Sequence, residues 1–243
     1  MVAKKSTEKR VERVPTGIRG LDSLMEGGIP KNSSVLVRGG TGCGKTILCL
    51  QYLYKGAIDY GDPGVFISFS ESRNLLLQHG MQFGWDLQSL EKKNLFTIIK
   101  YAPHEMIKIM EEGGGTIRDA IESMGTKRLV IDSITAYEMF FESRYKANES
   151  VLDLFEFLRE WNTTAFVTSE FPLPGHSDDF ADRTGFLSDS IINLFYCRHK
   201  SFARQRALEV MKMRDTCQDS SMYSFVIGKD GILIKGRARN IEY

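Results

Sequence analysis

Residues 39–46 form a pattern whose chemistry is phosphate binding. They read Gly-Gly-Thr-Gly-Cys-Gly-Lys-Thr and fit G-x-x-x-x-G-K-[ST] in full. Glycines let the backbone wrap closely around a phosphate, so several N–H groups and the start of the following helix point at the anion. Lys45 would reach the outer phosphates, and the hydroxyl of Thr46 would ligate Mg²⁺. The expected contacts to the bound group are Gly40, Thr41, Gly42, Cys43, Gly44, Lys45 and Thr46.

An acidic residue at the end of a neighbouring strand would complete the metal side of such a site. Residues 128–133 read Arg-Leu-Val-Ile-Asp-Ser, so an apolar run leads to Asp132. Many strands end at an Asp in a turn, and the run by itself is a weak signal. Beside the glycine-rich loop, it makes Asp132 the candidate that holds Mg²⁺ through its water shell.

Alternating apolar runs and helical spacings predict the elements that position these residues. The expected strands are 35–37, 65–69, 95–99, 129–131 and 165–168, and the expected helices are 46–60, 74–83, 116–124 and 151–161. Such alternation is typical of a mostly parallel sheet with helices on both faces. After residue 190 the pattern changes to successive strands over 191–196, 207–213, 223–227 and 231–234. We therefore expect an α/β fold with an antiparallel C-terminal extension at one edge of the sheet.

The composition is that of an ordinary globular domain. The sequence has 243 residues, of which 42% are apolar and 26% charged, and a formal net charge of +1. This balance argues against a histone-like polycation and an acidic disordered tail. No linker-like segment divides residues 14–243, which we expect to form one domain. The polar and basic stretch 1–13 is expected to be a loose arm.

Nothing in the sequence predicts a membrane segment. No apolar run approaches the roughly 20 residues of a membrane helix, and the basic start of the chain has no apolar stretch behind it. The cysteines are scattered and form no C-x-x-C pair, which indicates free thiols in a reducing compartment. We expect a cytoplasmic protein with no membrane partner. His79, His104 and His199 show no metal-ligand spacing, so no role is predicted for them.

Further segments resemble one family of proteins. They are Thr-Gly-Ile-Arg-Gly-Leu-Asp at 16–22, Gly-Gly-Ile-Pro at 27–30, Asp-Pro-Gly-Val-Phe-Ile at 62–67, Phe-Gly-Trp-Asp-Leu at 83–87 and Met-Lys-Met-Arg-Asp at 211–215. With the glycine-rich loop they resemble one domain of the KaiC-type ATPases, in the RecA/RadA recombinase superfamily, over about residues 14–236. The likeness fits an archaeal-type KaiC homologue or a RadA paralogue. It implies a RecA-like P-loop fold, ATP and Mg²⁺ as cofactors, and a homo-oligomeric ring, usually a hexamer, with ATP between adjacent subunits.

The resemblance also implies residues that act across the subunit boundary. In such rings a Lys-x-Arg pair reaches into the neighbour's site, and Lys212 and Arg214 occupy that motif here. Met213 and Thr216 beside them are implied nucleotide contacts. Two cations on one face of a strand could stabilise charge on the γ-phosphate. The alternative is a pair of solvated charges on an edge strand.

The chain departs from this family in the loop after the second of the predicted strands. The family has two adjacent Glu residues there, and the first is thought to polarise the attacking water. This chain has Ser70 followed by Glu71. A serine hydroxyl is a poor base, whereas a carboxylate can orient water and accept its proton. Either Glu71 is the catalytic carboxylate, acting with Lys45, Lys212 and Arg214, or hydrolysis is slow.

Two functions are consistent with these residues. The first is a Mg-dependent ATPase ring whose turnover drives an unknown protein partner. The second is a weakly hydrolysing, nucleotide-dependent accessory factor that binds DNA or acts in signalling. Single-stranded or double-stranded DNA would meet basic stretches at 4–13, 198–206 and 235–239. Ordinary solvated charge is the alternative, because the segment 172–185, where recombinases keep a DNA-facing loop, is rich in aspartate.

Overall fold

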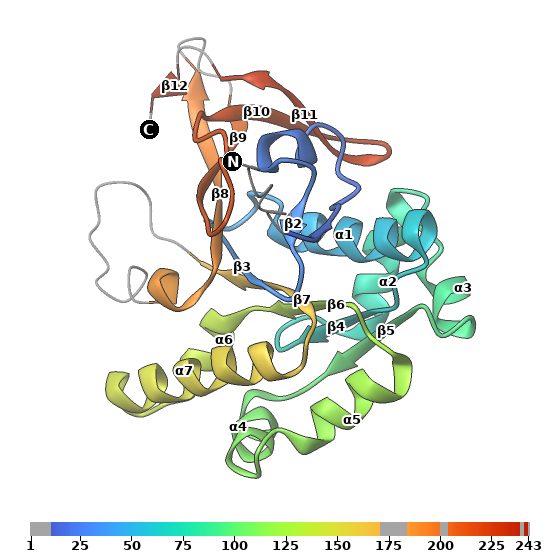
Figure 1. Ribbon diagram of the computed structural model, residues 1–243, viewed down its shortest axis with the longest axis vertical. Coiled ribbons are helices and arrows are strands. Elements are labelled where there is room, and N and C mark those ends of the chain that lie inside the picture. Colours follow the sequence, from blue (N-terminus) through green and yellow to red (C-terminus); the bar gives the residue numbers. More distant parts are fainter. Residues whose placement is uncertain (1–10, 171–183, 200–203, 239–240, 243) are drawn as a thin grey trace, which may run out of the picture.

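The computed structural model describes residues 11–170, 184–199, 204–238 and 241–242 (Figure 1). Most of the arm predicted at 1–13 and most of the aspartate-rich segment 172–185 lie outside these residues. Parts of the basic stretches 198–206 and 235–239 also lie outside them. The fold below is therefore that of the described residues.

Two sheets and a set of helices make up the fold. The large sheet contains β3 (Ser34–Gly39), β4 (Gly64–Ser68), β5 (Phe96–Lys100), β6 (Arg128–Asp132), β7 (Thr164–Ser169), β8 (Ser190–His199), β9 (Arg204–Met213), β10 (Tyr223–Gly228), β11 (Gly231–Arg237) and β12 (Ile241–Glu242). The small sheet pairs β1 (Arg13–Val14) with β2 (Ile29–Pro30). The helices are α1 (Lys45–Tyr60), α2 (Arg73–Gln82), α3 (Leu87–Lys92), α4 (Pro103–Glu111), α5 (Gly115–Met124), α6 (Ile134–Glu138), α7 (Arg144–Glu160) and a short 3₁₀ helix at Asp22–Met25.

The large sheet is mixed, with the strand order β11-β10-β9-β8-β3-β7-β6-β4-β5 and with β12 beside β8. Parallel pairing joins all strands from β8 to β5, whereas β8, β9, β10 and β11 pair antiparallel. This arrangement confirms the predicted α/β fold. One detail differs: the strand predicted at 191–196 as part of the antiparallel extension pairs in parallel with β3, where Ser190 lies opposite Val35. The antiparallel extension begins at β9.

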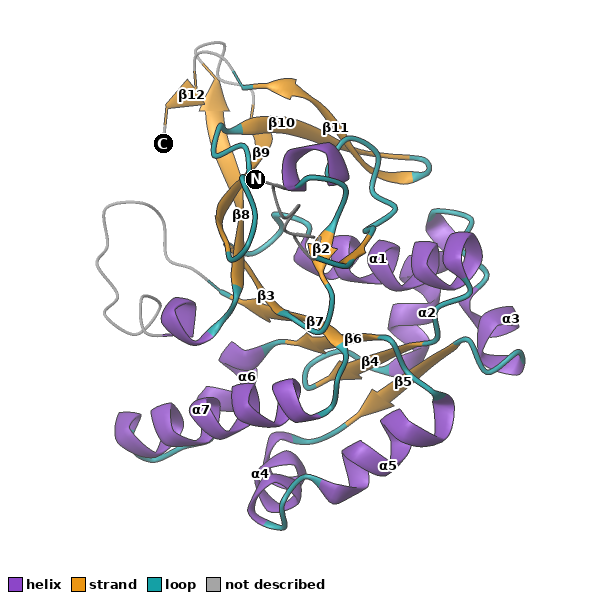
Figure 2. Cartoon of the chain, in the orientation of Figure 1, coloured by secondary structure: helices purple, strands orange, loops and turns teal. Residues whose placement is uncertain are grey.

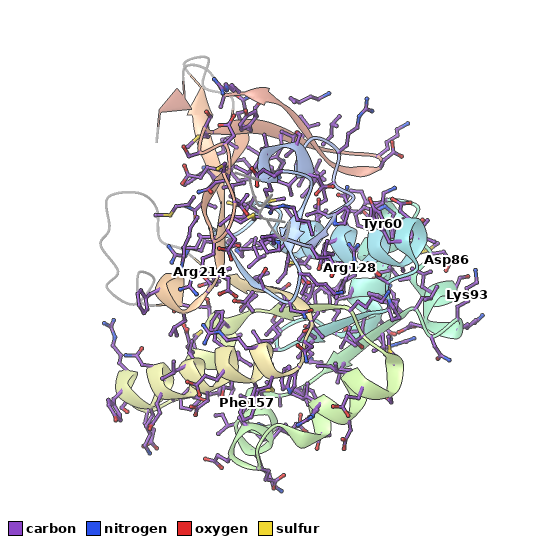
Figure 3. The ribbon with its side chains drawn as sticks, in the orientation of Figure 1. Tyr60, Asp86, Lys93, Arg128, Phe157 and Arg214 are labelled. Atoms are coloured by element: carbon purple, nitrogen blue, oxygen red, sulfur yellow. The ribbon has the colours of Figure 1, made fainter. Side chains whose placement is uncertain are left out.

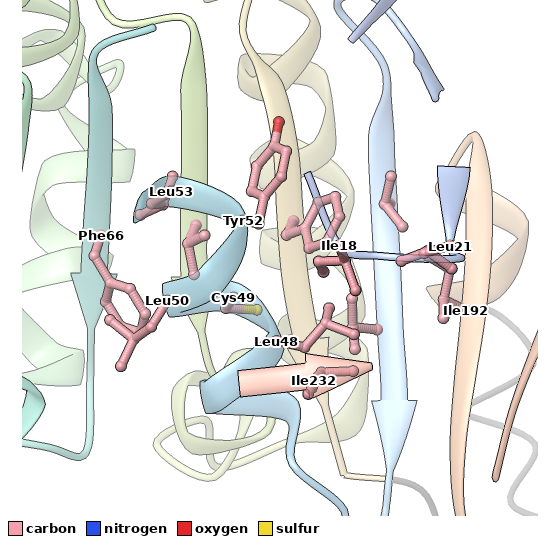
Figure 4. Packing of buried hydrophobic residues seen from close by; sticks show 14 of the residues in the cluster. Ile18, Leu21, Leu48, Cys49, Leu50, Tyr52, Leu53, Phe66, Ile192 and Ile232 are labelled. Carbon is pink, nitrogen blue, oxygen red and sulfur yellow. The ribbon is translucent and has the colours of Figure 1, made fainter. Parts of the chain in front are cut away.

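Helices cover both faces of the sheet (Figure 2). Successive side chains of a strand point to opposite faces, so each central strand contributes to two cores. Phe66 of β4 packs in the core beneath α1, whereas its neighbours Val65 and Ile67 pack in the core beneath α7. Helix α1 fills its own side with apolar residues that include Leu48 and Tyr52 (Figure 4). None of the helices in the described parts of the chain is long and apolar enough to cross a membrane.

Local caps explain helix starts that apolar spacing did not predict. The structure adds α3, α4 and α6 to the predicted helices and begins α7 at Arg144 rather than at 151. At α7, the hydroxyl of Ser143 accepts a hydrogen bond from the N–H of Lys146 (3.3 Å). At α4, the carboxylate of Glu105 accepts one from the N–H of Ala102 (2.7 Å). These contacts satisfy backbone groups that a helix leaves unpaired at its first turn.

A buried charged pair ties the start of β6 to the loop after α1. Arg128 is fully buried and donates hydrogen bonds to Oδ2 of Asp62 (2.8 and 3.0 Å) and to the carbonyl oxygen of Tyr52 (3.2 Å). Its guanidinium lies 4.8 Å from the ring centroid of Tyr52 and 5.2 Å from that of Tyr60 (Figure 3). A Cβ at Gly56 would lie 2.4 Å from Cδ of Arg128. The glycine inside α1 therefore makes room for a side chain from a distant strand.

Asp62→Ala should lower the free energy of unfolding by about 3 kcal/mol, because it leaves the charge of Arg128 buried without its partner. Urea denaturation followed by circular dichroism measures this change. Lys127→Ala is the matched control, since Lys127 pairs with the same carboxylate at 3.1 Å but its side chain is 62% exposed. We expect the control to change stability by less than about 0.5 kcal/mol. Equal effects of the two substitutions would contradict the assignment of the stabilisation to Arg128.

Candidate functional site

The glycine-rich loop joins the end of β3 to the start of α1. Gly42 and Gly44 have φ values of +80° and +107°, which residues with a Cβ rarely adopt. Nζ of Lys45 donates hydrogen bonds to the carbonyl oxygens of Gly39 (2.6 Å) and Gly40 (3.2 Å). The loop thus curls around its own lysine at the N-terminus of α1, where free N–H groups attract anions.

Asp132 accepts hydroxyl hydrogen bonds from two neighbouring elements. Thr46 Oγ1, at the first turn of α1, donates to Oδ2 of Asp132 (2.8 Å). Thr168 Oγ1, near the end of β7, donates to Oδ1 of the same carboxylate. The structure therefore brings together both residues predicted for the metal. It also adds Thr168, for which the sequence predicted no role, because the carboxylate that it contacts lies on a different strand.

The side chains of Thr46 and Asp132 are suitable ligands for Mg²⁺. A hydroxyl and a carboxylate oxygen are hard ligands, and protein-bound Mg²⁺ commonly takes only one or two such groups beside waters and substrate phosphates. Within the described residues, no group of three or more His, Cys, Asp or Glu side chains could form an all-protein metal cage. A metal at Thr46 and Asp132 would therefore need oxygen ligands from a bound phosphate and from water.

A cavity of about 360 Å³ lies over the loop and the ends of β4, β6 and β7. Lys45 and Arg206 provide its cations, and Glu71, Asp132 and Glu170 its carboxylates. The carboxylate of Glu170 accepts a hydrogen bond from the hydroxyl of Thr41 in the loop (3.2 Å). The cavity therefore combines a phosphate-binding backbone with groups of both charges.

Arg206 is a cation of this cavity that the sequence patterns did not assign to it. In sequence it belongs to a basic stretch considered for DNA, but β9 places its guanidinium against the loop, with Nη2 3.4 Å from the carbonyl oxygen of Gly42. Its guanidinium carbon lies 4.6 Å from the ring centroid of Tyr196 on β8. The alternation of side chains along β9 predicts on which face of the sheet Arg206 lies. Only the pairing of β9 with β8 and of β8 with β3 shows that the glycine-rich loop lies beside it.

Glu71 lies in the loop between β4 and α2, at the edge of the same cavity. Two hydrogen bonds fix its backbone: its N–H donates to Oγ of Ser68 (3.0 Å), and that hydroxyl donates to its carbonyl oxygen (2.9 Å). Burial raises the pKa of the Glu71 carboxyl, the nearby His79 opposes this shift, and the charge of Asp132 adds to it. A raised pKa makes this carboxylate a stronger proton acceptor than an exposed glutamate.

Lys212 and Arg214 lie at the other end of the sheet from the loop, and Figure 3 labels Arg214. Met213 lies opposite Ser190, and Ser190 lies opposite Val35 near the start of β3, whereas the loop follows the end of that strand. At about 3.3 Å per residue, the two ends of β3 are roughly 15 Å apart. Within one chain, the predicted cation pair does not reach the glycine-rich loop.

The side chains around Lys212 contact their own chain. Nζ of Lys212 donates to the carbonyl oxygens of Ser188 (2.6 Å) and Gly185 (3.1 Å), and burial lowers the pKa of this ammonium, as does the charge of Arg214. Arg214 pairs with Asp189 at 3.1 Å and is half-exposed. Of the other two implied contacts, Met213 is buried in the core, and the hydroxyl of Thr216 accepts a hydrogen bond from Arg13 (2.9 Å).

Comparison with known proteins decides the family. A family model described as "ATPase: KaiC" matches residues 14–239. The chain belongs to the KaiC-like ATPase family. The RecA-like fold and the resemblance inferred from sequence motifs are therefore confirmed, and the chain is a nucleotide-binding ATPase domain of this family.

Relatives from cyanobacteria and archaea support this assignment. The circadian clock oscillator protein KaiC of Prochlorococcus marinus subsp. pastoris is 34% identical over 245 residues, which cover 95% of this chain and 46% of the relative. The chain thus spans about half the length of the curated KaiC relatives it matches. UPF0273 protein MJ1359 of Methanocaldococcus jannaschii is 31% identical, with 92% of this chain and 96% of the relative covered. The crystal structure of KaiC-like protein PH0186 from Pyrococcus horikoshii OT3 superposes with a TM-score of 0.83 at 34% identity, covering 93% of this chain and 99% of that one.

At pH 7 we expect a maleimide reagent to modify Cys217 at least about tenfold faster than Cys43, since the thiolate is the reacting form. Cys217 is exposed, whereas burial raises the pKa of the Cys43 thiol in the glycine-rich loop. The rate at Cys43 should rise with pH as the thiolate forms. Mass spectrometry of peptides from a Cys197→Ser variant measures both sites. Modification of Cys43 as fast as Cys217 would contradict the burial of Cys43 in the glycine-rich loop.

Proposed function

We propose that this chain binds Mg-ATP at the glycine-rich loop and hydrolyses it. The observation that carries the proposal is the contact of Thr46 with Asp132 (2.8 Å) beside the ammonium of Lys45, over a cavity with a phosphate-binding backbone. The ammonium of Lys45 would leave the carbonyl oxygens of Gly39 and Gly40 and bind the outer phosphates instead. A bound Mg²⁺ at Thr46 and Asp132 would neutralise charge on those phosphates. The backbone of Gly40, Thr41, Gly42, Cys43 and Gly44 would cradle them.

Glu71 is the proposed acceptor of the proton from the attacking water. It is the carboxylate that the loop after β4 supplies to the cavity, where Ser70 provides only a hydroxyl. Its raised pKa would favour proton transfer from water, and its place in the cavity that Asp132 also lines supports a role beside the outer phosphates. Orientation of the water and acceptance of its proton are thus assigned to one side chain.

Glu71→Gln should lower kcat for ATP hydrolysis about 100-fold, because the amide cannot accept the proton. Nucleotide affinity should change less than about threefold, since the substitution keeps the shape of the side chain. Phosphate release and titration with a fluorescent ATP analogue measure the two quantities.

Two control variants accompany this measurement. Glu122→Gln removes a charge on α5, where the side chain is 61% exposed, and should leave turnover unchanged. Lys45→Met should abolish nucleotide binding itself. If Lys45→Met binds nucleotide as tightly as the native chain, the proposed site is wrong, whereas unchanged turnover in Glu71→Gln removes only the role of Glu71.

We further propose a homo-oligomeric ring, with six subunits as the expected number, in which Lys212 and Arg214 act on the nucleotide of the neighbouring subunit. Their place at the opposite end of the sheet supports this arrangement, because only a second copy could bring them to a glycine-rich loop. Two cations there would stabilise negative charge on the γ-phosphate. Thr216 and the backbone of Met213, whose side chain is buried in its own core, would lie at the same boundary, and the ring-forming unit would be residues 14–243.

Mixing two inactive variants tests this arrangement. Lys45→Met and Arg214→Ala should each lower kcat by at least about 100-fold when alone. In a 1:1 mixture, about one half times one half, or a quarter, of the subunit boundaries would join an intact Lys45 to an intact Arg214 and recover activity. Molar mass in solution with and without Mg-ATP confirms assembly. A mixture of Lys45→Met with Arg118→Ala, a surface substitution on α5, is the control for dilution by inactive subunits and should keep about half of the native turnover. Assembly without recovery would contradict action across the boundary.

A weakly hydrolysing accessory factor is the second candidate, and Ser70 is the observation that favours it. In that case ATP would control assembly on DNA or on a cytoplasmic protein partner rather than drive work. Tight nucleotide binding, with equal and very low turnover in the native chain and in Glu71→Gln, would support it. Fluorescence anisotropy of labelled single-stranded DNA, titrated with the protein at several salt concentrations, would show whether the accessory factor binds DNA. Binding through phosphate contacts should weaken as the salt concentration rises.

A further inference from the structure

Two hydrogen bonds to Ser68 fix the backbone of Glu71, but its carboxylate has few contacts of its own. Its atom Oε2 is buried and accepts no well-aligned hydrogen bond from the described residues. Nε2 of His79 lies 3.3 Å from this oxygen, which is an ion-pair distance when the imidazole is protonated. His79 is therefore the side chain that neighbours the proposed proton acceptor.

Helix α2 determines where His79 lies. The hydroxyl of Ser72 caps the helix by accepting a hydrogen bond from the N–H of Leu75 (3.3 Å). Leu76 is fully buried, and a Cβ at Gly80 would lie 2.6 Å from Cδ1 of Leu87, so this face of α2 packs tightly. His79 is one turn beyond Leu76 and adjoins Gly80, which fixes its position at the rim of the cavity.

We propose that His79 is a positioning residue that holds the carboxylate of Glu71 in the cavity. The inference rests on the proposed role of Glu71 and adds a residue to which the sequence gave no role. A glutamate on a loop loses rotamer freedom when its side chain is fixed, so some contact must select its orientation.

The chemistry of this loop makes such a contact more important in this chain. Ser70 occupies the neighbouring position, so one carboxylate from this loop serves the reaction instead of two. An acceptor must lie within hydrogen-bond reach of the water from which it takes a proton. A displacement of about 1 Å can lower a rate about 100-fold. His79 would thus act on the reaction through its contact with Glu71, and not through a contact with the phosphates.

A double-mutant cycle tests the proposal. His79→Leu removes the imidazole nitrogens, His79→Gln keeps an N–H donor at similar reach, and each is made in the native chain and with Glu71→Gln. The side chain of His79 is 41% exposed, so both substitutions are compatible with the fold, which circular dichroism and thermal melting check. His104→Leu, an exposed histidine on α4, is the matched control.

We expect His79→Leu to lower kcat for Mg-ATP hydrolysis about fivefold to tenfold. The affinity for a fluorescent ATP analogue should stay within about twofold, since the contact is to Glu71 rather than to nucleotide. His79→Gln should keep at least about half of the turnover because its amide can replace the imidazole donor. With Glu71→Gln already present, His79→Leu should lower single-turnover hydrolysis less than about twofold further. His104→Leu should change none of these quantities.

Three results would overturn the inference while the proposed ATPase function stands. They are unchanged kcat in His79→Leu, an equal loss in both Glu71 backgrounds, and a loss of nucleotide affinity with kcat preserved. Unchanged turnover in Glu71→Gln alone would overturn the roles of both Glu71 and His79. Failure of ATP binding in the native chain would instead reject the proposed function, a result that the affinity titration distinguishes.

Discussion

Hydrogen bonds between parallel strands bring the carboxyl ends of β3, β4, β6 and β7 to one edge of the sheet. Ser68 lies opposite Asp132, and Val37 lies opposite Thr168, so the residues that follow these strands converge. A shift of one residue of β7 against β3 would turn β7 and the adjoining β6 to the other face and separate the carboxylate of Asp132 from Thr46. The two cores that lock β4 and β6 between α1 and α7 therefore stabilise the geometry of the site as well as the fold.

The electrostatics of the cavity follow from this convergence. Carboxylates from three different strand ends lie near two cations, and partial burial raises the pKa of Glu71 although His79 acts in the opposite direction. Asp132 differs from Glu71 because hydroxyl groups of Thr46 and Thr168 donate to it directly. These two contacts fix the orientation of the carboxylate, and a carboxylate oxygen is the kind of hard ligand that Mg²⁺ prefers. The roles proposed for the two acids, metal binding for Asp132 and proton transfer for Glu71, thus fall on side chains with different surroundings.

The same sheet separates this cavity from the cation pair at the far end of β9. Lys212 contacts backbone carbonyls of its own chain, and Arg214 contacts Asp189. In the proposed ring these contacts would stiffen the surface that one subunit presents to the next. One rigid sheet would then carry the phosphate loop at one end and the groups for the neighbouring loop at the other.

The sequence alone determined the parts of this protein whose conformation is local. The loop at 39–46, the hydroxyl and carboxylate that Thr46 and Asp132 supply, and the apolar strands can be predicted from sequence because glycine conformation, helix termini and side-chain alternation act within a few residues. The sequence predicted no role for His79 or Thr168 and placed Arg206 in a basic stretch considered for DNA. It could not say which end of the sheet carries Lys212. The places of Arg206, Thr168 and Lys212 depend on the strand order, which brings Arg206 to Gly42 from 164 positions away, whereas His79 reaches Glu71 through the packing of α2. Only the tertiary structure decided them, because hydrogen-bond register between strands and packing between layers are properties of pairs of distant segments.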